Sequence, residues 1–420
     1  MGDFKFIHVG DVHIGHERLE GRLPSKDFAD AFDQAVTAAI DGQVQFVLVA
    51  GDFFDKARIE PTHLAEGEAG LRRLRDARIP VVAIEGNHDV VSSYDPRPSW
   101  LTYLNQAGLL RLLRTEFENG KPCFREWTDA GRTGNWLDLG GARIVGAGWF
   151  GASTAKRLES MAPAIEKRGF TILLLHAGLN GVAREFGMID LDQLAVVREK
   201  VDYLALGHVH RAYGRDGWIY NAGAMENWDL GEAEYGDDKG YLLVTVTDGK
   251  ASTVLTPVKR RPVLLPTVNC AAAGCQDDVV RLVREAAAAW TLPSNGVVRA
   301  TLALLPPFDV DARAVAAEIE KAIPLAAANV RLAYRAVAAD TTEEGYLPRD
   351  VIEREELERL IAEKGKYGGQ VELVRELIRI VMSGRTDEEL FDELLGKARP
   401  LIEKQNEAPA TPITERQVVR

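Results

Sequence analysis

Short apolar runs alternate with stretches of helical periodicity over roughly the first 260 residues. The runs at 4–9 (FKFIHV), 44–50 (VQFVLVA) and 81–84 (VVAI) have the length of buried strands. Between them, apolar positions recur with the helical period at 27–40 and again around 71–77. This alternation predicts a layered α/β domain, with helices covering the faces of its sheets.

More strands are predicted farther along, and no long helical stretch separates the last few of them. They lie at 142–148, 171–176, 203–208, 218–223 and 240–247. Short connections of this kind indicate a mixed sheet or two stacked sheets. The segment 90–135 is richer in arginine, proline and aromatic residues, and we interpret it as excursions around the mouth of a site.

The pattern changes after residue 258. Residues 263–336 show the order strand, helix, strand, helix, strand, and helical periodicity follows from 348 to about 400. The fold class predicted for the chain is therefore α/β, with a layered β-sandwich core flanked by helices. We predict this core at 1–258, a small α+β domain at 259–340, a helical segment at 341–404 and a disordered tail at 405–420.

The composition is that of a folded protein with more than one domain: 420 residues, 46% of them hydrophobic and 27% charged. Neither a charged-then-apolar leader nor an apolar run near the roughly 18 residues of a membrane helix is found, so we expect a cytoplasmic protein without a membrane segment. The three cysteines, Cys123, Cys270 and Cys275, lack zinc-type pairing and fit a reducing compartment.

The net charge of −12 argues against a nucleic-acid partner, because an acidic surface repels phosphates. About half of this excess lies in residues 340–404, however, which hold 17 acidic and 11 basic residues. A bound metal elsewhere would also reverse the local sign. Charge alone therefore does not decide the substrate.

Polar side chains follow five of the predicted strands. Asp11 and His13 come after the first, and Asp52 after the second. The remaining ones are Asn87, His88 and Asp89, then His176, then His208 and His210. Five of the eight histidines fall in these places. A single histidine of this kind is more often a core or loop residue, but the whole set at strand ends favours a site for two metal ions.

Two divalent cations about 3.5 to 4 Å apart would suit hydrolysis of a phosphodiester, because they neutralise its oxygens and lower the pKa of a bound water. A carboxylate shared between the ions would hold them at that distance. Imidazole, carboxylate and amide ligands together favour Mn, with Fe or Zn as alternatives, over Mg or Ca.

The motifs DVH (11–13), GDFFD (51–55), GNHD (86–89) and GHVH (207–210), with His176 between the last two, resemble those of the calcineurin-like metallophosphoesterase superfamily. Within it, they are most similar to the SbcD and meiotic recombination eleven family of DNA double-strand-break repair nucleases. The resemblance is specific over residues 4–225, and it implies a metallophosphoesterase core followed by a capping domain.

The resemblance also implies a role for each site residue. Asp11, His13 and His210 would hold one metal, Asn87, His176 and His208 the other, and Asp52 would bridge them. His88 would stay off the metals and act on the scissile phosphate, with Asp89 orienting it.

Further side chains are candidates for substrate contact. Asp55 stands where certain relatives have a histidine, and His16 where an aromatic residue is common, so a supporting or substrate role is assigned to Asp55. The candidates for contact with a DNA backbone are Arg58, Arg97, Arg125 and Arg211, with Trp100 and Trp127. The alternative interpretation is that these are solvated arginines and core tryptophans.

Three functions compete. A two-metal DNA exonuclease or endonuclease, the nuclease subunit of an SbcCD-like repair complex, is favoured by the roughly 160 residues beyond the core. A phosphatase or cyclic-nucleotide phosphodiesterase has the same core motifs and is the alternative. A binding module without activity would need a broken ligand set, and all seven ligand positions are intact.

Two protein partners are also expected. A homodimer is suggested by Leu71 and Leu74 in one helical pattern and by Trp100, Leu101, Tyr103 and Leu104 in another. The alternative is that these are core residues, which is the commoner case. An SMC-like coiled-coil ATPase of the SbcC type is expected to bind the helical segment. The apolar seam of that segment consists of Val371, Val374, Ile378 and Val381, widened by Leu373, Leu377 and Ile380. The alternative is that these residues pack within a helical hairpin of the chain itself.

Overall fold

The computed structural model describes residues 2–19, 23–90, 98–183, 187–305, 309–323 and 327–334. The chain divides into two compact units, residues 1–337 and 338–420. The second unit lies outside the described residues, as do the predicted helical segment and tail.

The first sheet has six strands in the order β16-β15-β1-β2-β3-β4. Strands β1 to β4 are parallel, and β15 and β16 extend the sheet as an antiparallel pair beside β1. Their bounds are β1 Phe4–Val9, β2 Phe46–Val49, β3 Val81–Ala83, β4 Arg111–Leu112, β15 Gly240–Thr247 and β16 Lys250–Pro257.

The second sheet also has six strands, in the order β13-β14-β12-β9-β8-β7. Its four central strands are parallel and the two edge strands antiparallel. The bounds are β7 Trp136–Leu139, β8 Ala142–Gly148, β9 Phe170–His176, β12 Tyr203–Gly207, β13 Tyr213–Arg215 and β14 Ile219–Asn221. Two mixed sheets are thus present, as the short connections predicted.

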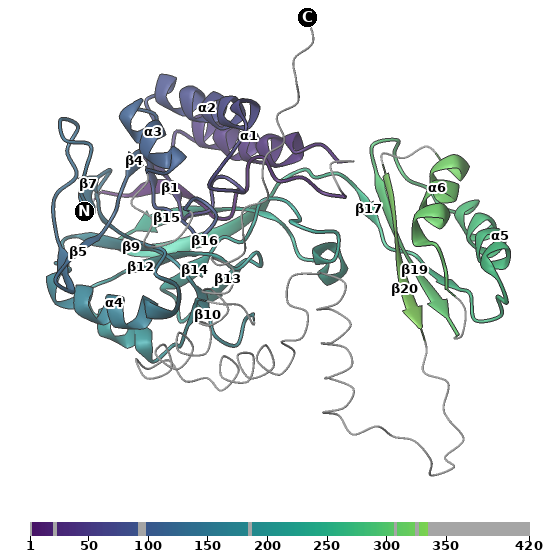
Figure 1. Cartoon of the computed structure of the whole chain (residues 1–420). Coiled ribbons are helices and arrows are strands. Elements are labelled where there is room, and N and C mark those ends of the chain that lie inside the picture. The colour runs from purple at the N-terminus through teal and green to yellow at the C-terminus, as the bar shows by residue number, and fades with distance from the viewer. Residues whose placement is uncertain are drawn as a thin grey trace, which may run out of the picture. The chain divides into compact units, whose positions relative to one another are not determined.

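The apolar faces of the two sheets pack against each other, with Phe6, Phe46 and Leu48 from the first meeting Ile172, Leu174 and Tyr203 from the second. Figure 1 shows α1, α2 and α3 on one side of the paired sheets and α4 on the other. These helices are α1 Lys26–Asp41, α2 Pro61–Asp76, α3 Trp100–Gln106 and α4 Thr154–Met161. The core is therefore a four-layer sandwich, which agrees with the predicted fold class.

Short elements complete this domain. Two small sheets pair β5 Glu116–Glu118 with β6 Lys121–Cys123 and β10 Gly178–Leu179 with β11 Met188–Ile189. Four 3₁₀ turns are η1 Gly151–Ser153, η2 Ala162–Ala164, η3 Gln193–Val197 and η4 Glu232–Tyr235.

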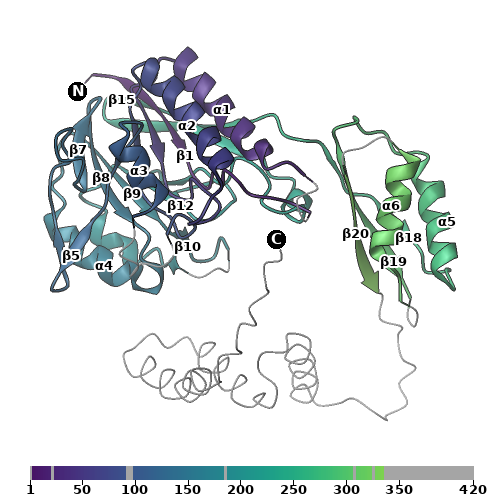
Figure 2. The same cartoon turned by 45° about the horizontal axis from the view of Figure 1, so that its top comes forward.

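The residues after the core form a small parallel sheet in which β17, β18 and β20 all pair with β19. Figure 2 shows α5 and α6 side by side on this sheet, where their apolar faces cover β19. The bounds are β17 Val263–Leu264, β18 Thr267–Asn269, α5 Gln276–Ala287, β19 Val297–Leu304, α6 Ala312–Ala322 and β20 Ala327–Tyr334. The predicted element order is right, but parallel pairing makes this part α/β rather than α+β.

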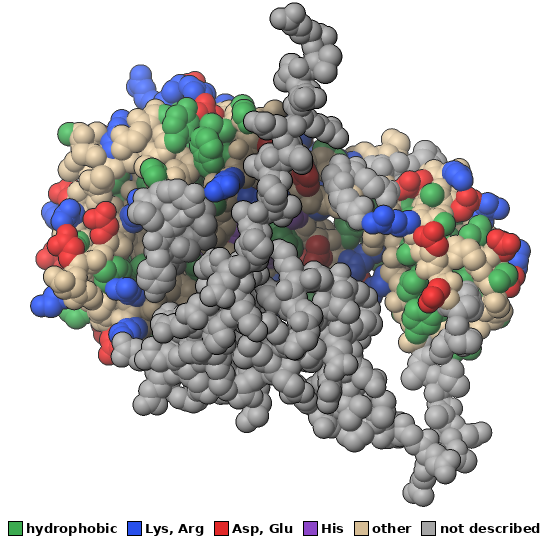
Figure 3. Space-filling view, in the orientation of Figure 1, with side chains coloured by type: hydrophobic (Ala, Val, Ile, Leu, Met, Phe, Trp, Pro, Cys, Tyr) green, Lys and Arg blue, Asp and Glu red, His purple; other side chains and the backbone are tan. Residues whose placement is uncertain are grey.

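None of the helices in the described part of the chain has the length and apolar character needed to cross a membrane. On the face drawn in Figure 3, acidic and basic side chains are interspersed over the described residues.

Candidate metal centre

Each of the seven expected ligands lies at or just beyond the carboxyl end of a parallel strand. Asp11 and His13 follow β1, Asp52 follows β2 and Asn87 follows β3, all in the first sheet. From the second sheet, His176 ends β9, while His208 and His210 follow β12. The stacked sheets bring these ends to one place, because carboxyl ends of parallel strands share an edge.

The side chains gather into two groups that could each hold an ion. Ligand atoms of Asp11, His13 and His210 lie within 4.8 Å of one another, as do those of Asp52, His176 and His208. The amide oxygen of Asn87 lies 3.0 Å from His176 Nε2 and 3.0 Å from His208 Nδ1, which adds it to the second group. Asp52 connects the groups, since it also lies near His13. These two sets contain the residues that the resemblance assigns to the two metals, and a third group, His13, Asp52 and His88, overlaps both positions.

The Nε2 atoms of two histidine rings face these places. His176 Nδ1 donates to the Ala50 carbonyl oxygen at 2.7 Å, and His210 Nδ1 donates to Glu232 Oε1 at 2.6 Å. In the neutral form of each ring, the lone pair of Nε2 is therefore available to a cation. His13 Nε2 and His210 Nε2 are 3.2 Å apart. Two nitrogens on adjacent positions of one ion lie about 3.0 to 3.4 Å apart when each bond is about 2.1 Å.

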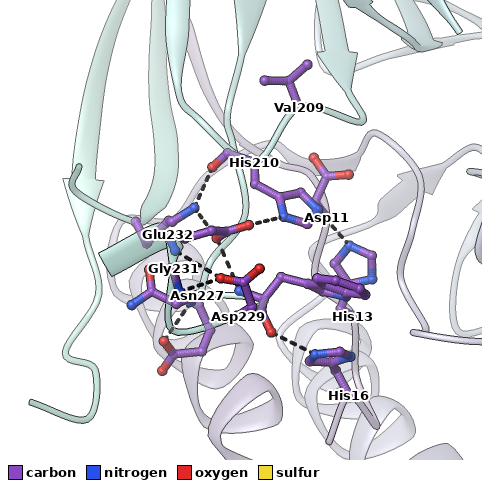
Figure 4. A network of polar contacts seen from close by, with 12 residues as sticks. Asp11, His13, His16, Val209, His210, Asn227, Asp229, Gly231 and Glu232 are labelled. Carbon is purple, nitrogen blue, oxygen red and sulfur yellow. Dashed lines mark hydrogen bonds and ion pairs between the residues drawn. The ribbon is translucent and has the colours of Figure 1, made fainter. Parts of the chain in front are cut away.

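A charged network supports His210 from outside. Glu232 is the first residue of η4, and its second carboxylate oxygen accepts from Lys239 Nζ at 2.7 Å and from the Trp228 amide at 3.1 Å. The Lys239 ammonium also donates to the His210 carbonyl oxygen. Figure 4 shows Glu232 against His210, which in turn points at His13. This network fixes both the orientation and the tautomer of the ring.

The electrostatics keep the carboxylates of Asp52 and Glu232 ionised. Burial alone would raise the pKa of Asp52, but His176 holds that pKa well below its usual range. Burial would lower the pKa of His176, and the Asp52 charge instead raises it to about 9. Burial also opposes ionisation of Glu232, yet His210 and Lys239 lower the pKa of Glu232 to about 2. These ionised carboxylates favour the binding of a cation at the site.

The loops that carry the ligands have constrained backbones. Asp11, His13, Asp52 and His208 have φ values of 50°, 49°, 50° and 87°, in or near the left-handed region. The loops after β1 and β2 hold each other in register, with His13 N donating to the Asp52 carbonyl oxygen at 3.0 Å. Strain of this kind clusters at functional sites, where it directs a side chain away from the strand direction.

His88 lies beside both groups. Its ring Nδ1 donates to the Asp55 carbonyl oxygen at 2.6 Å, which leaves Nε2 facing the site. His88 is also within 4.8 Å of ligand atoms of His13 and Asp52. The backbone amide of His88 donates to Asp52 Oδ1 at 2.8 Å.

The expected contact between Asp89 and the His88 ring is wrong. The Asp89 carboxylate instead accepts from the backbone amides of Gly86 (2.9 Å), Phe54 (3.1 Å) and Phe53 (3.4 Å). It therefore ties the loop after β3 to the loop after β2, and Asp89 supports Asp52 and Asn87 through the backbone. The orienting partner of His88 is the carbonyl oxygen of Asp55.

The Asp55 carboxylate belongs to a buried cluster beside His13. It accepts from His16 Nδ1 at 2.7 Å and from Trp228 Nε1 at 3.1 Å, and His13 Nδ1 lies 3.6 Å away. The His16 and Trp228 rings are stacked at 4.6 Å. With its side chain 3% exposed, Asp55 supports other site residues.

The arginines expected at the substrate surface do not share one place. Arg58 is exposed, and Arg211 is exposed and paired with Asp237 at 2.7 Å. Arg125 pairs with Glu118, and Arg97 lies outside the described residues. Trp127 is buried beside Val81, at the amino end of β3, so this part of segment 90–135 lies away from the metal ligands.

The leucines expected to pair two protomers are core residues. The core between the first sheet and its helices fully buries Leu71 and Leu74 of α2 and Leu101 and Leu104 of α3. Tyr103, which is 46% exposed, and the partly buried Trp100 remain at the surface of α3.

Three residues of the site were not predicted from the sequence: Glu232, Lys239 and Trp228. Glu232 lies 22 residues from His210 in a loop rich in acidic residues. No spacing or strand end distinguishes it there.

Comparisons with known proteins agree with this geometry. Residues 4–212 match the family model described as calcineurin-like phosphoesterase. The DNA double-strand break repair protein Mre11 of Archaeoglobus fulgidus is 31% identical over 272 residues, which cover 57% of this chain and 57% of that protein. The protein of the same name from Haloferax volcanii is 28% identical over 287 residues, covering 67% of this chain and 58% of its own.

The chain thus spans less than two thirds of the length of these curated relatives. Among solved structures, a dimetal phosphatase from Danio rerio matches 60% of this chain and 98% of its own, with 14% identity and a TM-score of 0.39.

Proposed function

The amino-terminal part of this chain, residues 4–212, belongs to the calcineurin-like phosphoesterase family, and we propose that the protein is a two-metal phosphodiesterase that cleaves DNA in the cytoplasm. The observation that carries this proposal is the meeting of two donor groups around Asp52, built from five strand ends of two sheets. Hydrolysis of a phosphodiester is the reaction that such a paired site suits best.

The donor set fits a pair of divalent cations. Asp11, His13 and His210 would hold one ion and Asn87, His176 and His208 the other, with Asp52 shared. His176 shows why a cation belongs here: both of its ring nitrogens face acceptors, so the ring is either doubly protonated or shares its Nε2 lone pair with a metal. The mixture of nitrogen and oxygen donors favours Mn, with Fe or Zn next.

When bound, the two ions neutralise the phosphate oxygens and lower the pKa of the attacking water. The protein itself contributes a proton site at His88 Nε2, because Nδ1 is committed to the Asp55 carbonyl oxygen. When the ring is doubly protonated, Nε2 can donate to the leaving oxygen or stabilise the charge that develops on the phosphate. Asp89 keeps His88 and Asp52 at a fixed spacing by joining their two loops.

DNA is supported as the substrate by the names of the two relatives and by the residues beyond the core. The small sheet of β17 to β20 follows the core directly, as a capping domain for an extended substrate would. We propose that segment 341–404, predicted to be helical, binds an SMC-like ATPase of the SbcC type. We also propose a homodimer that forms through α3, where Tyr103 is exposed.

The test is incubation of the purified protein with Mn and labelled linear DNA, beside the small diester bis-p-nitrophenyl phosphate. We expect metal-dependent hydrolysis of both, and loss of both on chelation. Hydrolysis of the small diester without DNA cleavage, even with an ATPase partner present, would support a small-substrate phosphoesterase instead.

A further inference from the structure

A cavity lies beside the residues that lead into β3 and β4, at the end of the first sheet opposite the metal ligands. Its volume is about 320 Å³, within the range of small-ligand sites. Ile79, Pro80 and Val81 line it before and at the start of β3, whereas Asn87 follows the end of that strand. The cavity and the metal ligands are therefore at opposite ends of one strand.

The rim of the cavity is strongly basic. Arg75, Arg78, Arg111 and Arg132 line it, and Asp129 is the one acidic residue among its described lining. They come from the end of α2, from β4 and from the loop before β7, so the cluster is made by tertiary structure rather than by a run in the sequence.

Two of these arginines have side chains that make no hydrogen bond or ion pair within the described residues. Arg75 is paired with Asp76, and Arg132 donates to the Asn105 carbonyl oxygen in the last turn of α3. The Arg78 side chain has neither a hydrogen bond nor an ion pair among the described residues, and the Arg111 side chain has only its stacking on the Trp127 ring at 5.3 Å. An arginine that stabilised a helix end would bond to the terminal carbonyl groups, as Arg132 does.

One of the buried lining residues, Trp127, has a donor without a partner. Ile79, Leu110 and Trp127 are 7%, 4% and 5% exposed, so the base of the cavity is apolar and packed. The indole N–H of Trp127 is buried and has no hydrogen-bond partner among the described residues. An unpaired buried donor is costly, which favours a ligand that brings an acceptor.

We propose that this cavity binds a phosphate group, held by Arg78 and Arg111 above the buried Trp127. Guanidinium forks match the oxygens of a phosphate in pairs, and the low exposure of the floor strengthens such charged hydrogen bonds. The phosphate belongs to one of two sources, a nucleic-acid backbone or a free nucleotide, and both present the same anionic oxygens.

The test compares two double variants of the full-length protein loaded with Mn. R78Q/R111Q removes the two uncommitted arginines. R168Q/R215Q removes the same charge from two exposed arginines outside the cavity lining, at 71% and 59% exposure. Each is titrated calorimetrically with inorganic phosphate and with a nucleoside 5′-monophosphate, and hydrolysis of the small diester serves as the measure of an intact metal centre.

We expect the wild type and R168Q/R215Q to show a phosphate-binding event that R78Q/R111Q weakens about tenfold or more, with small-diester hydrolysis unchanged. A non-cleavable phosphorothioate duplex separates the sources. If the backbone is the source, R78Q/R111Q also weakens duplex binding and reduces its salt dependence by about one unit of slope. If a free nucleotide is the source, phosphate and nucleotide binding fall and duplex binding is unchanged.

Phosphate, nucleotide and duplex titrations that are the same for R78Q/R111Q and R168Q/R215Q would overturn the proposal. The comparison separates this proposal from the proposed function, because both variants keep the same metal centre and any phosphate bound there contributes equally to the two titrations. Absence of small-diester hydrolysis in the wild type would contradict the proposed function and leave the comparison of phosphate binding intact.

Discussion

At the scale of single residues, the candidate centre depends on groups that never touch a metal. A carbonyl oxygen accepts from Nδ1 of His176 and a carboxylate accepts from Nδ1 of His210, so that Nε2 of each ring faces the site. Outer partners of this kind set ligand basicity and tautomer. The ligand types could be predicted from the sequence, whereas their partners could not.

Glu232 provides the sharpest test of such support. We predict that Glu232→Gln weakens Mn binding about 10- to 100-fold at the position held by His210, because the neutral amide no longer enhances the basicity of the ring and leaves Lys239 without its carboxylate. Metal titration of the purified variant measures this. Glu234→Gln, at an exposed residue of the same η4 turn, is the control. Equal affinities for the two variants would contradict the role given to Glu232.

A second residue prediction concerns pH. His8 of β1 is fully buried between the sheets, where Nε2 donates to the Leu206 carbonyl oxygen and Nδ1 accepts from the Tyr203 hydroxyl. Burial lowers the pKa of His8 from 6.5 to about 4. The unfolded chain therefore binds a proton below pH 6.5 that the folded chain takes up only near pH 4, so stability is complete above pH 6.5 and is lost as the pH falls toward 4.

The loss attributable to His8 amounts to about 3.4 kcal/mol at most, from a shift of some two and a half units at about 1.36 kcal/mol each. His8→Gln keeps a donor and an acceptor but does not titrate, so its unfolding free energy, measured by denaturant, should fall less between pH 6.5 and 4.5 than that of the wild type. Parallel pH profiles for the two proteins would exclude this assignment.

At the scale of elements, the strands and their polar ends were the predictable part. An apolar run that ends in a polar residue indicates both a strand and a candidate site. This pattern predicts that Asp52 and His176 belong to one site, and the structure places them beside each other. Helical periodicity predicts α1 and α2 but not which neighbours they cover, so it leaves Leu71 and Leu74 open to a dimer surface or the core, and the structure places them in the core. A pattern shows that a face is buried, not what buries it.

Adjacent residues were also misjudged. The neighbouring positions of His88 and Asp89 suggested contact between their side chains, yet the turn sends one ring toward Asp55 and the other side chain toward the loop after β2. Local sequence cannot define such directions, because they depend on a loop from a different strand.

The turn after β3 allows a prediction without removal of any ligand. A Cβ atom added at Gly86 would lie 2.2 Å from Asp52 Oδ1, so Gly86→Ala must displace the shared carboxylate. We expect about a 100-fold loss in rate and depleted Mn. Gly10→Ala is the matched control, since its Cβ would meet no atom closer than 3.5 Å. Full metal content in Gly86→Ala would show that the carboxylate tolerates the shift.

At the scale of the whole molecule, the compact first unit ends at residue 337, and the acidic segment that the sequence predicts to be helical follows it. Truncation after Asp340 should therefore leave hydrolysis of a small diester intact. It should abolish co-purification with an SMC-like ATPase, because the seam from Val371 to Val381 is removed. Retention of the ATPase by the truncated protein, at the level seen with the full chain, would place the docking surface elsewhere.

The central claim is that Asp52 joins two metal ions while His88 acts on the phosphate. It is tested most directly by the Mn content, after equilibrium dialysis, of the wild type, Asp52→Ala and His88→Gln. We expect two ions in the wild type and in His88→Gln, which loses turnover but no metal. We expect a depleted site in Asp52→Ala, because two cations repel each other without a shared carboxylate. His88 lies close enough to His13 and Asp52 to be a ligand itself. Depletion of His88→Gln to the level of Asp52→Ala would contradict the account.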